Sequence, residues 1–256
     1  MQLDFSSKET WLHRINPSLK LFVLIMLCIV VLSIHDLLFM MNFTVIVLIL
    51  FLCYTGQPLT RISLLFIPFF VVFLSTSSSM ILFGQGNTTW FKWGLIHITE
   101  ESFFRGLLVG FRALLFAVLG LTFALTTRPV YLFYSLMQQV KLNPKYAYSF
   151  MAALRLIPIM MEEFQTIQNA MRVRGVVRQT GIRSVFFKMK AYSIPMLSGS
   201  IRRAHRIAVA MEAKHFSDTR NRTYYYEIGF SKYDIVFILY FVTLLLAGYY
   251  GAIKGI

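Results

Sequence analysis

Long stretches without any charged residue constrain the fold of this chain more than any other feature. A membrane-spanning helix needs about 20 mostly apolar residues, because the hydrocarbon core of a bilayer is about 30 Å thick. Charge-free runs occupy residues 21–35, 37–60, 62–91, 113–127 and 235–253. These runs predict five membrane-spanning helices, at about 19–35, 37–55, 62–83, 106–127 and 234–253.

The composition agrees with a membrane protein. The chain of 256 residues is 57% apolar and 14% charged, whereas soluble domains average about 45–50% apolar and about 25% charged. The first twenty residues are polar and no small-residue cleavage pattern follows, so we expect no cleavable signal peptide. Cys28 and Cys53 both fall inside expected spans, and we interpret them as packing residues.

Positive charge is concentrated in one part of the chain. Between Lys141 and Arg222 there are fifteen Lys and Arg residues and four Asp and Glu residues, giving +11 of the net +14. Short loops rich in Lys and Arg stay on the cytoplasmic side of a membrane. We therefore expect this segment to be cytoplasmic. The N-terminal cations predict the same side for the N-terminus; these are Lys8, Arg14 and Lys20.

These patterns together predict an all-α integral membrane protein with about five transmembrane helices and a cytoplasmic module of amphipathic helices. Residues 1–127 would hold the cytoplasmic N-terminus and four spans. Residues 128–232 would form the basic cytoplasmic module, and residues 233–256 would form the last span. The loop at 84–105 and the C-terminus would then lie outside.

Two apolar stripes run along the basic module, and each ends in a cation. Pro144, Pro158 and Pro195 suit helix starts. The first stripe has the spacing 4, 3, 4 of one helical face and reaches a cation three positions later; it comprises Met160, Phe164, Ile167, Met171 and then Arg174. The second has the same spacing; it comprises Ser200, Ala204, Ile207, Met211 and then Lys214.

The two stripe ends are similar in sequence, AMRVRG at 170–175 and AMEAKH at 210–215. An apolar stripe that ends in a cation suits a partner groove with an acidic end, where the cation fixes register. A cation also stabilises the C-terminus of its own helix by about 0.3–1 kcal/mol, and basic flanks bind anionic lipid. Because the same ending occurs on two helices, we favour a binding site for a partner. We expect the flanking Glu162 and Glu163 to form a solvated face.

Three segments resemble one family, the transmembrane T component of energy-coupling factor transporters. LHRINPSLK at 12–20 resembles its opening segment, and the segments at 155–175 and 202–216 resemble its two coupling helices. The resemblance implies a scaffold in the plasma membrane of a prokaryote. It would join two cytoplasmic ATPases of the ABC type, which bind the ATP, to a membrane subunit that binds a vitamin or metal ion.

The resemblance also implies a contact for each ATPase. Arg174 and Lys214 would each enter a groove of one ATPase. The full set of expected coupling residues is Met171, Val173, Arg174, Gly175, Met211, Ala213, Lys214 and His215. The helix face expected to support them comprises Met160, Phe164, Ile167, Ala204 and Ile207.

This chain departs from the family pattern at four positions. Val173 stands where the family has Ala, and Asn16 stands where it has Asp. Lys214 replaces Arg and His215 replaces Gly. Lysine lacks the planar fork of arginine, and losing glycine removes the easy left-handed cap. We therefore expect a weaker or differently shaped second contact, as in a dedicated transporter rather than a shared module.

Several functions are disfavoured by missing motifs. No phosphate-binding loop of the form Gly-x-x-x-x-Gly-Lys-Ser/Thr occurs, so we expect no ATP hydrolysis by this chain, no enzyme activity and no bound cofactor. The five histidines are scattered, so we expect no metal site, and the membrane topology already explains the basic charge without nucleic acid.

Two alternatives to the coupling scaffold stay open. A self-sufficient secondary transporter or channel would have broken or polar spans in repeated halves, and a membrane enzyme could use the basic face for anionic substrates. For the scaffold, a vitamin is the expected cargo, with thiamine or its hydroxymethylpyrimidine precursor as the leading guess from the resemblance.

Overall fold

The computed structural model describes residues 10–84, 88–93, 96–175, 182–216 and 223–254. The chain divides into two units. The first comprises Met1–Ser135 and Glu227–Ile256, and the second comprises Leu136–Tyr226. The second unit is therefore an insertion between two parts of the first.

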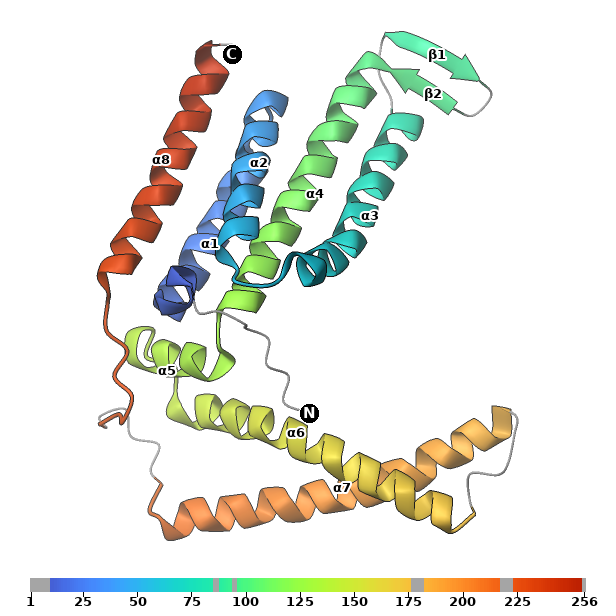
Figure 1. Ribbon diagram of the computed structural model, residues 1–256, viewed down its shortest axis with the longest axis vertical. Helices are drawn as coiled ribbons and strands as arrows, with labels where there is room; N and C mark the ends of the chain where they lie inside the picture. Colours follow the sequence, from blue (N-terminus) through green and yellow to red (C-terminus); the bar gives the residue numbers. More distant parts are fainter. Residues whose placement is uncertain (1–9, 85–87, 94–95, 176–181, 217–222, 255–256) are drawn as a thin grey trace. The chain divides into compact units, whose positions relative to one another are not determined.

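The first unit is a group of helices that run alongside one another (Figure 1). A short 3-10 helix, η1 (Trp11–Arg14), precedes them, and a two-stranded antiparallel hairpin, β1 (Thr89–Trp93) and β2 (Ile96–Thr99), joins two of them. The helices are α1 (Pro17–Ser33), α2 (Leu37–Tyr54), α3 (Leu59–Phe83), α4 (Glu100–Thr126) and α8 (Lys232–Lys254). Helix α5 (Pro129–Gln139) leads from the first unit into the second.

The predicted helical membrane fold is confirmed. Within the described residues, the segments Leu37–Tyr54, Thr60–Phe83 and Glu100–Thr126 are long and apolar enough to cross a membrane, and Pro17–Ser33 is a shorter apolar helix. A total of five spans remains a prediction. Helix α4 packs against α1, α2 and α3, so that Val47, Leu115 and Val118 are almost fully buried.

Helix α4 begins earlier than the apolar run predicts. The expected span starts at 106, but the helix starts at Glu100. Thr99 accepts a hydrogen bond from the Ser102 backbone (3.2 Å), and Ser102 Oγ accepts one from the Thr99 backbone (3.1 Å). This reciprocal cap and the acidic first turn stabilise a polar helix start, which a search for apolar residues misses.

Arg112, the charge inside α4, has a specific partner. Its guanidinium donates a hydrogen bond of 2.7 Å to the carbonyl oxygen of Ile34, the residue that follows α1. The side chain is half-buried. The contact fits the rule that charges within membrane segments face other protein groups, and it anchors the end of α1 to α4.

Two of the three prolines expected at helix starts lie inside helices instead. Pro144 is the first residue of α6 (Pro144–Val173), with Asn143 as its cap, as predicted. Pro158 lies within α6, and Pro195 lies within α7 (Ile182–Ala213). A proline removes one hydrogen bond and crowds the preceding turn, but a helix of 30 residues has enough other interactions to continue through it.

Two glycines four positions apart bring α3 and α4 close together. A Cβ atom added at Gly106 would lie 2.6 Å from Ile81 Cγ1 and 3.0 Å from the Ser77 carbonyl oxygen. At Gly110 it would lie 3.0 Å from the Phe73 ring. Small residues at this spacing let helices in a membrane approach closely. The pair therefore sets the contact between these two helices, and buried Ser77 belongs to the same contact.

We expect Gly106→Ala to destabilise the protein by about 1–3 kcal/mol, because the added methyl group would force apart two well-packed helices. The matched control is Gly120→Ala in the same helix, since an added Cβ there has nothing within 4 Å. Thermal unfolding in detergent measures both. A Gly106→Ala variant as stable as Gly120→Ala would contradict the close contact.

Candidate functional site

The second unit contains two long helices, α6 and α7, that cross each other (Figure 1). At the crossing, Ser200 Oγ lies 3.3 Å from the sulfur atom of Met160. Gly199 is buried there, and an added Cβ would lie 2.7 Å from a Glu163 carboxylate oxygen. The absence of a side chain at Gly199 therefore leaves room for the Glu163 carboxylate at this point.

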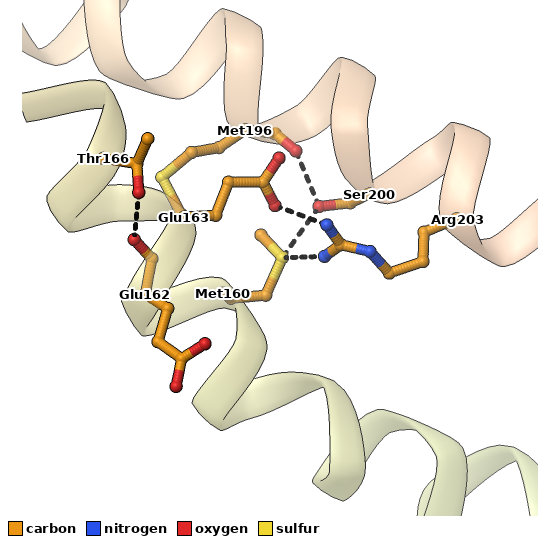
Figure 2. A network of polar contacts seen from close by, with 7 residues as sticks. All are labelled: Met160, Glu162, Glu163, Thr166, Met196, Ser200 and Arg203. Atoms are coloured by element: carbon orange, nitrogen blue, oxygen red, sulfur yellow. Dashed lines mark hydrogen bonds and ion pairs between the residues drawn. The ribbon is translucent and has the colours of Figure 1, made fainter. Parts of the chain in front are cut away.

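An ion pair crosses from one helix to the other at the same place. Arg203 donates a hydrogen bond of 2.9 Å to a Glu163 carboxylate oxygen, and it also lies 3.4 Å from the Met160 sulfur. Figure 2 shows the Arg203 side chain reaching from α7 towards these two groups on α6. The expectation of a solvated acidic face is therefore wrong for Glu163, which is half-buried in this contact; Glu162 is exposed.

The helices cross at equivalent positions of the two stripes. Met160 contacts Ser200, and Glu163 contacts Arg203, so both contacts join residues 40 positions apart. The stripe ends, Arg174 and Lys214, are also 40 positions apart. Each cation lies 14 positions after its crossing residue, which is about 21 Å along a helix that rises about 1.5 Å per residue. The two cations are thus at equal distances from the crossing.

The two arms extend in opposite directions from the crossing (Figure 1). The end of α7 is held near the start of α6 by an edge-to-face contact between Phe216 and Tyr148, with ring centroids 5.5 Å apart. The two stripe ends are therefore separate surfaces on opposite sides of the crossing, and each can contact a different partner molecule.

Both arms end in the same backbone conformation. Gly175 has φ +72°, in the left-handed region, and its N–H donates to the Arg172 carbonyl at 3.1 Å. His215 occupies the equivalent place with φ +53°, and its N–H donates to the Glu212 carbonyl at 2.9 Å. Phe216 N–H closes the turn on Met211 at 3.0 Å. This is the usual glycine-type cap of a helix, and here histidine adopts it as well.

The expected coupling residues are mostly exposed. Val173 is 89% exposed, and Arg174, Ala213, Lys214 and His215 are also exposed. Among the described residues, no carboxylate lies within ion-pair distance of either terminal cation. By contrast, Met171 and Met211 are half-buried. Each arm therefore presents a cation that its own described surroundings do not neutralise.

The stripe residues nearer the crossing have a different role from those at the ends. Met160 and Ser200 contact each other, so this part of each stripe is used within the chain. Phe164, with 38% of its surface exposed, packs edge-to-face on Tyr192 of α7 at 5.6 Å. Ile167 and Ile207 are half-buried, and Ala204 is exposed. The supporting face thus joins the helices at one end and remains accessible further along.

A groove of about 650 Å³ lies beside the crossing. Its lining is mainly apolar and comes largely from α6, including Leu156, Ile157, Met161 and Phe164, with Met196 and Arg203 from α7. Ile157 and Met161 are more than half exposed. Elsewhere on α7, Leu197 and Ile201 are also exposed. An exposed apolar surface of this kind is typical of a contact with a protein partner or lipid.

The N-terminal motif LHRINPSLK forms a buried turn in the first unit. Leu12 is fully buried, and Asn16 caps α1 by accepting a hydrogen bond of 3.2 Å from Ser18 N–H. Lys20 is 1% exposed and donates to the Leu12 carbonyl at 2.7 Å. Lys20 is therefore a buried structural residue, although the charge pattern alone groups it with surface cations. Lys8 lies outside the described residues.

Comparison with known proteins agrees with these features. The family model described as CbiQ, cobalt transport protein, matches residues 8–225. The chain belongs to this family. Its relatives include the energy-coupling factor transporter transmembrane protein EcfT of Limosilactobacillus fermentum, 32% identical over 67% of this chain and 70% of the relative. The EcfT proteins of Macrococcus caseolyticus, 25% identical, and Brevibacillus brevis, 28% identical, each match over 94% of both chains.

Family membership confirms the resemblance that the sequence motifs indicated. The family is a non-catalytic membrane component, in agreement with the expectation that this chain is not an enzyme. Among the described residues, no group of three or more His, Cys, Asp or Glu side chains is arranged to hold a metal ion.

The cap geometry predicts opposite effects of two substitutions. A residue other than glycine in the left-handed region is disfavoured by about 1–2 kcal/mol. His215→Gly should therefore stabilise the last turn of α7, and Gly175→Ala should destabilise the last turn of α6. A difference of about 1 kcal/mol changes the opening equilibrium about fivefold, which hydrogen–deuterium exchange of these turns measures. Faster exchange in His215→Gly would contradict the cap.

Proposed function

We propose that the chain is the energy-coupling membrane scaffold of an energy-coupling factor importer. In this role it links two cytoplasmic ATPases of the ABC type to a membrane subunit that binds the substrate. The observation that carries the proposal is the pair of equal arms, each ending in an exposed cation 14 positions from the crossing. Two equivalent arms suit two related partners that work as a pair.

The chemistry of each arm end suits a groove with an acidic residue. The cation sits at the C-terminus of its helix, where the exposed carbonyl groups carry partial negative charge and support it. Val173 and Ala213 precede the cations and are exposed, so each end offers a small apolar surface beside the charge. Apolar area supplies affinity, whereas the charge fixes orientation. We assign Arg174 to one ATPase and Lys214 to the other.

The crossing would convert ATPase movement into movement of the scaffold. Because α6 and α7 are joined by the Met160–Ser200 contact and the Glu163–Arg203 ion pair, a displacement of one arm end tilts its helix against the other. The apolar groove beside the crossing suits the substrate-binding subunit, since a membrane-embedded partner offers apolar helix surfaces to fill it. Closure of the ATPase pair would thereby reorient that subunit.

We further propose that the protein lies in the plasma membrane of a prokaryote. The basic module and the N-terminus would both be on the cytoplasmic side. The transported substrate is chosen by the partner subunit, and the names of the matched relatives state none. Uptake of a vitamin, with thiamine or its pyrimidine precursor first, remains a prediction from the resemblance. The identity of the small membrane protein that co-purifies with the chain tests it.

We expect Arg174→Ala and Lys214→Ala to weaken ATPase binding while leaving membrane insertion intact. Removing one partner of a desolvated, hydrogen-bonded charge pair typically costs about 2–5 kcal/mol. The measurement is the amount of each ATPase that co-purifies with the tagged chain in mild detergent. Matched controls are Arg155→Ala in α6 and Arg206→Ala in α7, because both cations are exposed and lie away from the arm ends.

The controls should retain both ATPases, and the double variant Arg174→Ala/Lys214→Ala should lose them. Full recovery of both ATPases with the double variant would overturn the proposed function. A chain that purifies without ATPases and moves a solute into liposomes without ATP would instead support a secondary transporter.

Because the two ends carry different cations, we expect Lys214→Arg to strengthen the contact of the second arm with its ATPase. An arginine guanidinium makes two directed hydrogen bonds to a carboxylate, whereas an ammonium is a point charge. If the groove ends in a carboxylate, the variant should dissociate more slowly from the ATPase, which surface-bound complexes in a biosensor measure directly. Faster dissociation would indicate that the second groove is shaped for lysine.

A further inference from the structure

The two places where the first unit is interrupted by the second both contact one residue, Asn16. The chain leaves the first unit after Ser135, within α5, and returns to it at Glu227. Ser135 hydrogen-bonds to Asn16 where the chain leaves, and Gly229 and Asp234 do so shortly after it returns. Asn16 precedes α1 and lies more than a hundred positions from either connection in sequence.

The outgoing connection is held through a buried hydroxyl group. Ser135 Oγ donates a hydrogen bond of 2.6 Å to Asn16 Oδ1, and it accepts one of 3.3 Å from Ser18 N–H. Ser135 has no exposed surface, and Asn16 is 3% exposed. The last residue of the first unit before the insertion is therefore fixed to the start of α1.

The returning connection is held through a buried carboxylate. Asn16 N–H donates a hydrogen bond of 2.8 Å to Asp234 Oδ1, and Ser231 N–H donates one of 2.7 Å to Asp234 Oδ2. The Asn16 amide group also lies 3.5 Å from the Gly229 carbonyl oxygen. Asp234 is 2% exposed and lies in the first turn of α8. The chain is thus held to Asn16 within a few residues of its return.

Helix α1, which Asn16 caps, is in turn joined to the end of α4 by Lys20. Its ammonium group donates to the Leu12 carbonyl at 2.7 Å and to Thr126 at 3.0 Å through Oγ1 and 3.3 Å through the carbonyl. Thr126 is the last residue of α4. Opening these contacts would leave buried polar groups without partners, at a cost of about 1–3 kcal/mol each. The contacts therefore resist local movement.

We infer that Asn16 is a positioning residue that anchors both attachments of the second unit to one point of the membrane helices. When the second unit moves, it then rotates about a fixed anchor, and its movement is transmitted to α1, α4 and α8 together. With a loose attachment, the same movement would be absorbed by the connections. This inference rests on the proposed function, because it concerns the transmission of ATPase movement.

The test uses the full chain in complex with its co-purified ATPases, and spin labels in both units report their separation. Cys28 and Cys53 are replaced by Ala, and labels are placed at Thr60→Cys in α3 and Lys190→Cys in α7, which are exposed positions. The variants are Ser135→Ala and Asn16→Ala. The control is Ser102→Ala, because Ser102 is equally buried and hydrogen-bonded but lies at the other end of α4.

We expect a single distance distribution in the parent that shifts when ATP and vanadate are added. Ser135→Ala and Asn16→Ala should broaden the distribution and diminish the shift while the ATPases stay bound, whereas Ser102→Ala should leave both unchanged. An unaltered distribution in Ser135→Ala, or equal broadening in Ser102→Ala, would overturn the inference. A parent chain that binds no ATPase would instead overturn the proposed function.

Discussion

The contact of two helices at equivalent positions is the constraint on which the second unit depends. Because Met160 meets Ser200 and Glu163 meets Arg203, the crossing point divides α6 and α7 in the same way. The equal reach of the two arms follows from that register and from the equal length of sequence to each cation. A slip of one helix by a single turn would remove the ion pair and give the arms unequal lengths, by about 5.4 Å.

The first unit is held together by a different kind of interaction. Helices surrounded by lipid gain little from apolar burial, so close contacts of small residues and buried hydrogen bonds must hold them. Gly106 and Gly110 supply the first, since they let α4 approach α3 closely. Buried hydrogen bonds are made by Asn16 with Asp234 and by Lys20 with Leu12. These contacts hold the helices of the first unit to one another.

The sequence predicted those features that follow from the periodicity of apolar residues. Apolar runs located the helices α1 to α4 and α8, and the stripes with spacing 4, 3, 4 run to the C-terminal ends of α6 and α7. Periodicity could not find contacts between distant segments, such as Ser135 with Asn16. The Glu163–Arg203 pair had a readable signal, because opposite charges occupy the two helices at the same offset of 40 positions as the repeat. The prediction that Pro158 and Pro195 begin helices was wrong, because the effect of a proline depends on its position within a long helix and not on residue type alone.

The two arm ends differ in sequence but share one backbone conformation. The loss of glycine at His215 predicted a differently shaped end, yet His215 adopts the same left-handed conformation as Gly175. The backbone that presents the cation is therefore alike in both arms, and the difference lies in the side chains. One arm ends in the ammonium group of Lys214 followed by the imidazole of His215, whereas the other ends in the guanidinium of Arg174 followed by Gly175, which has no side chain. Two partners with similar overall folds but different groove chemistry would match this pair better than two identical partners, because identical grooves would favour identical ends.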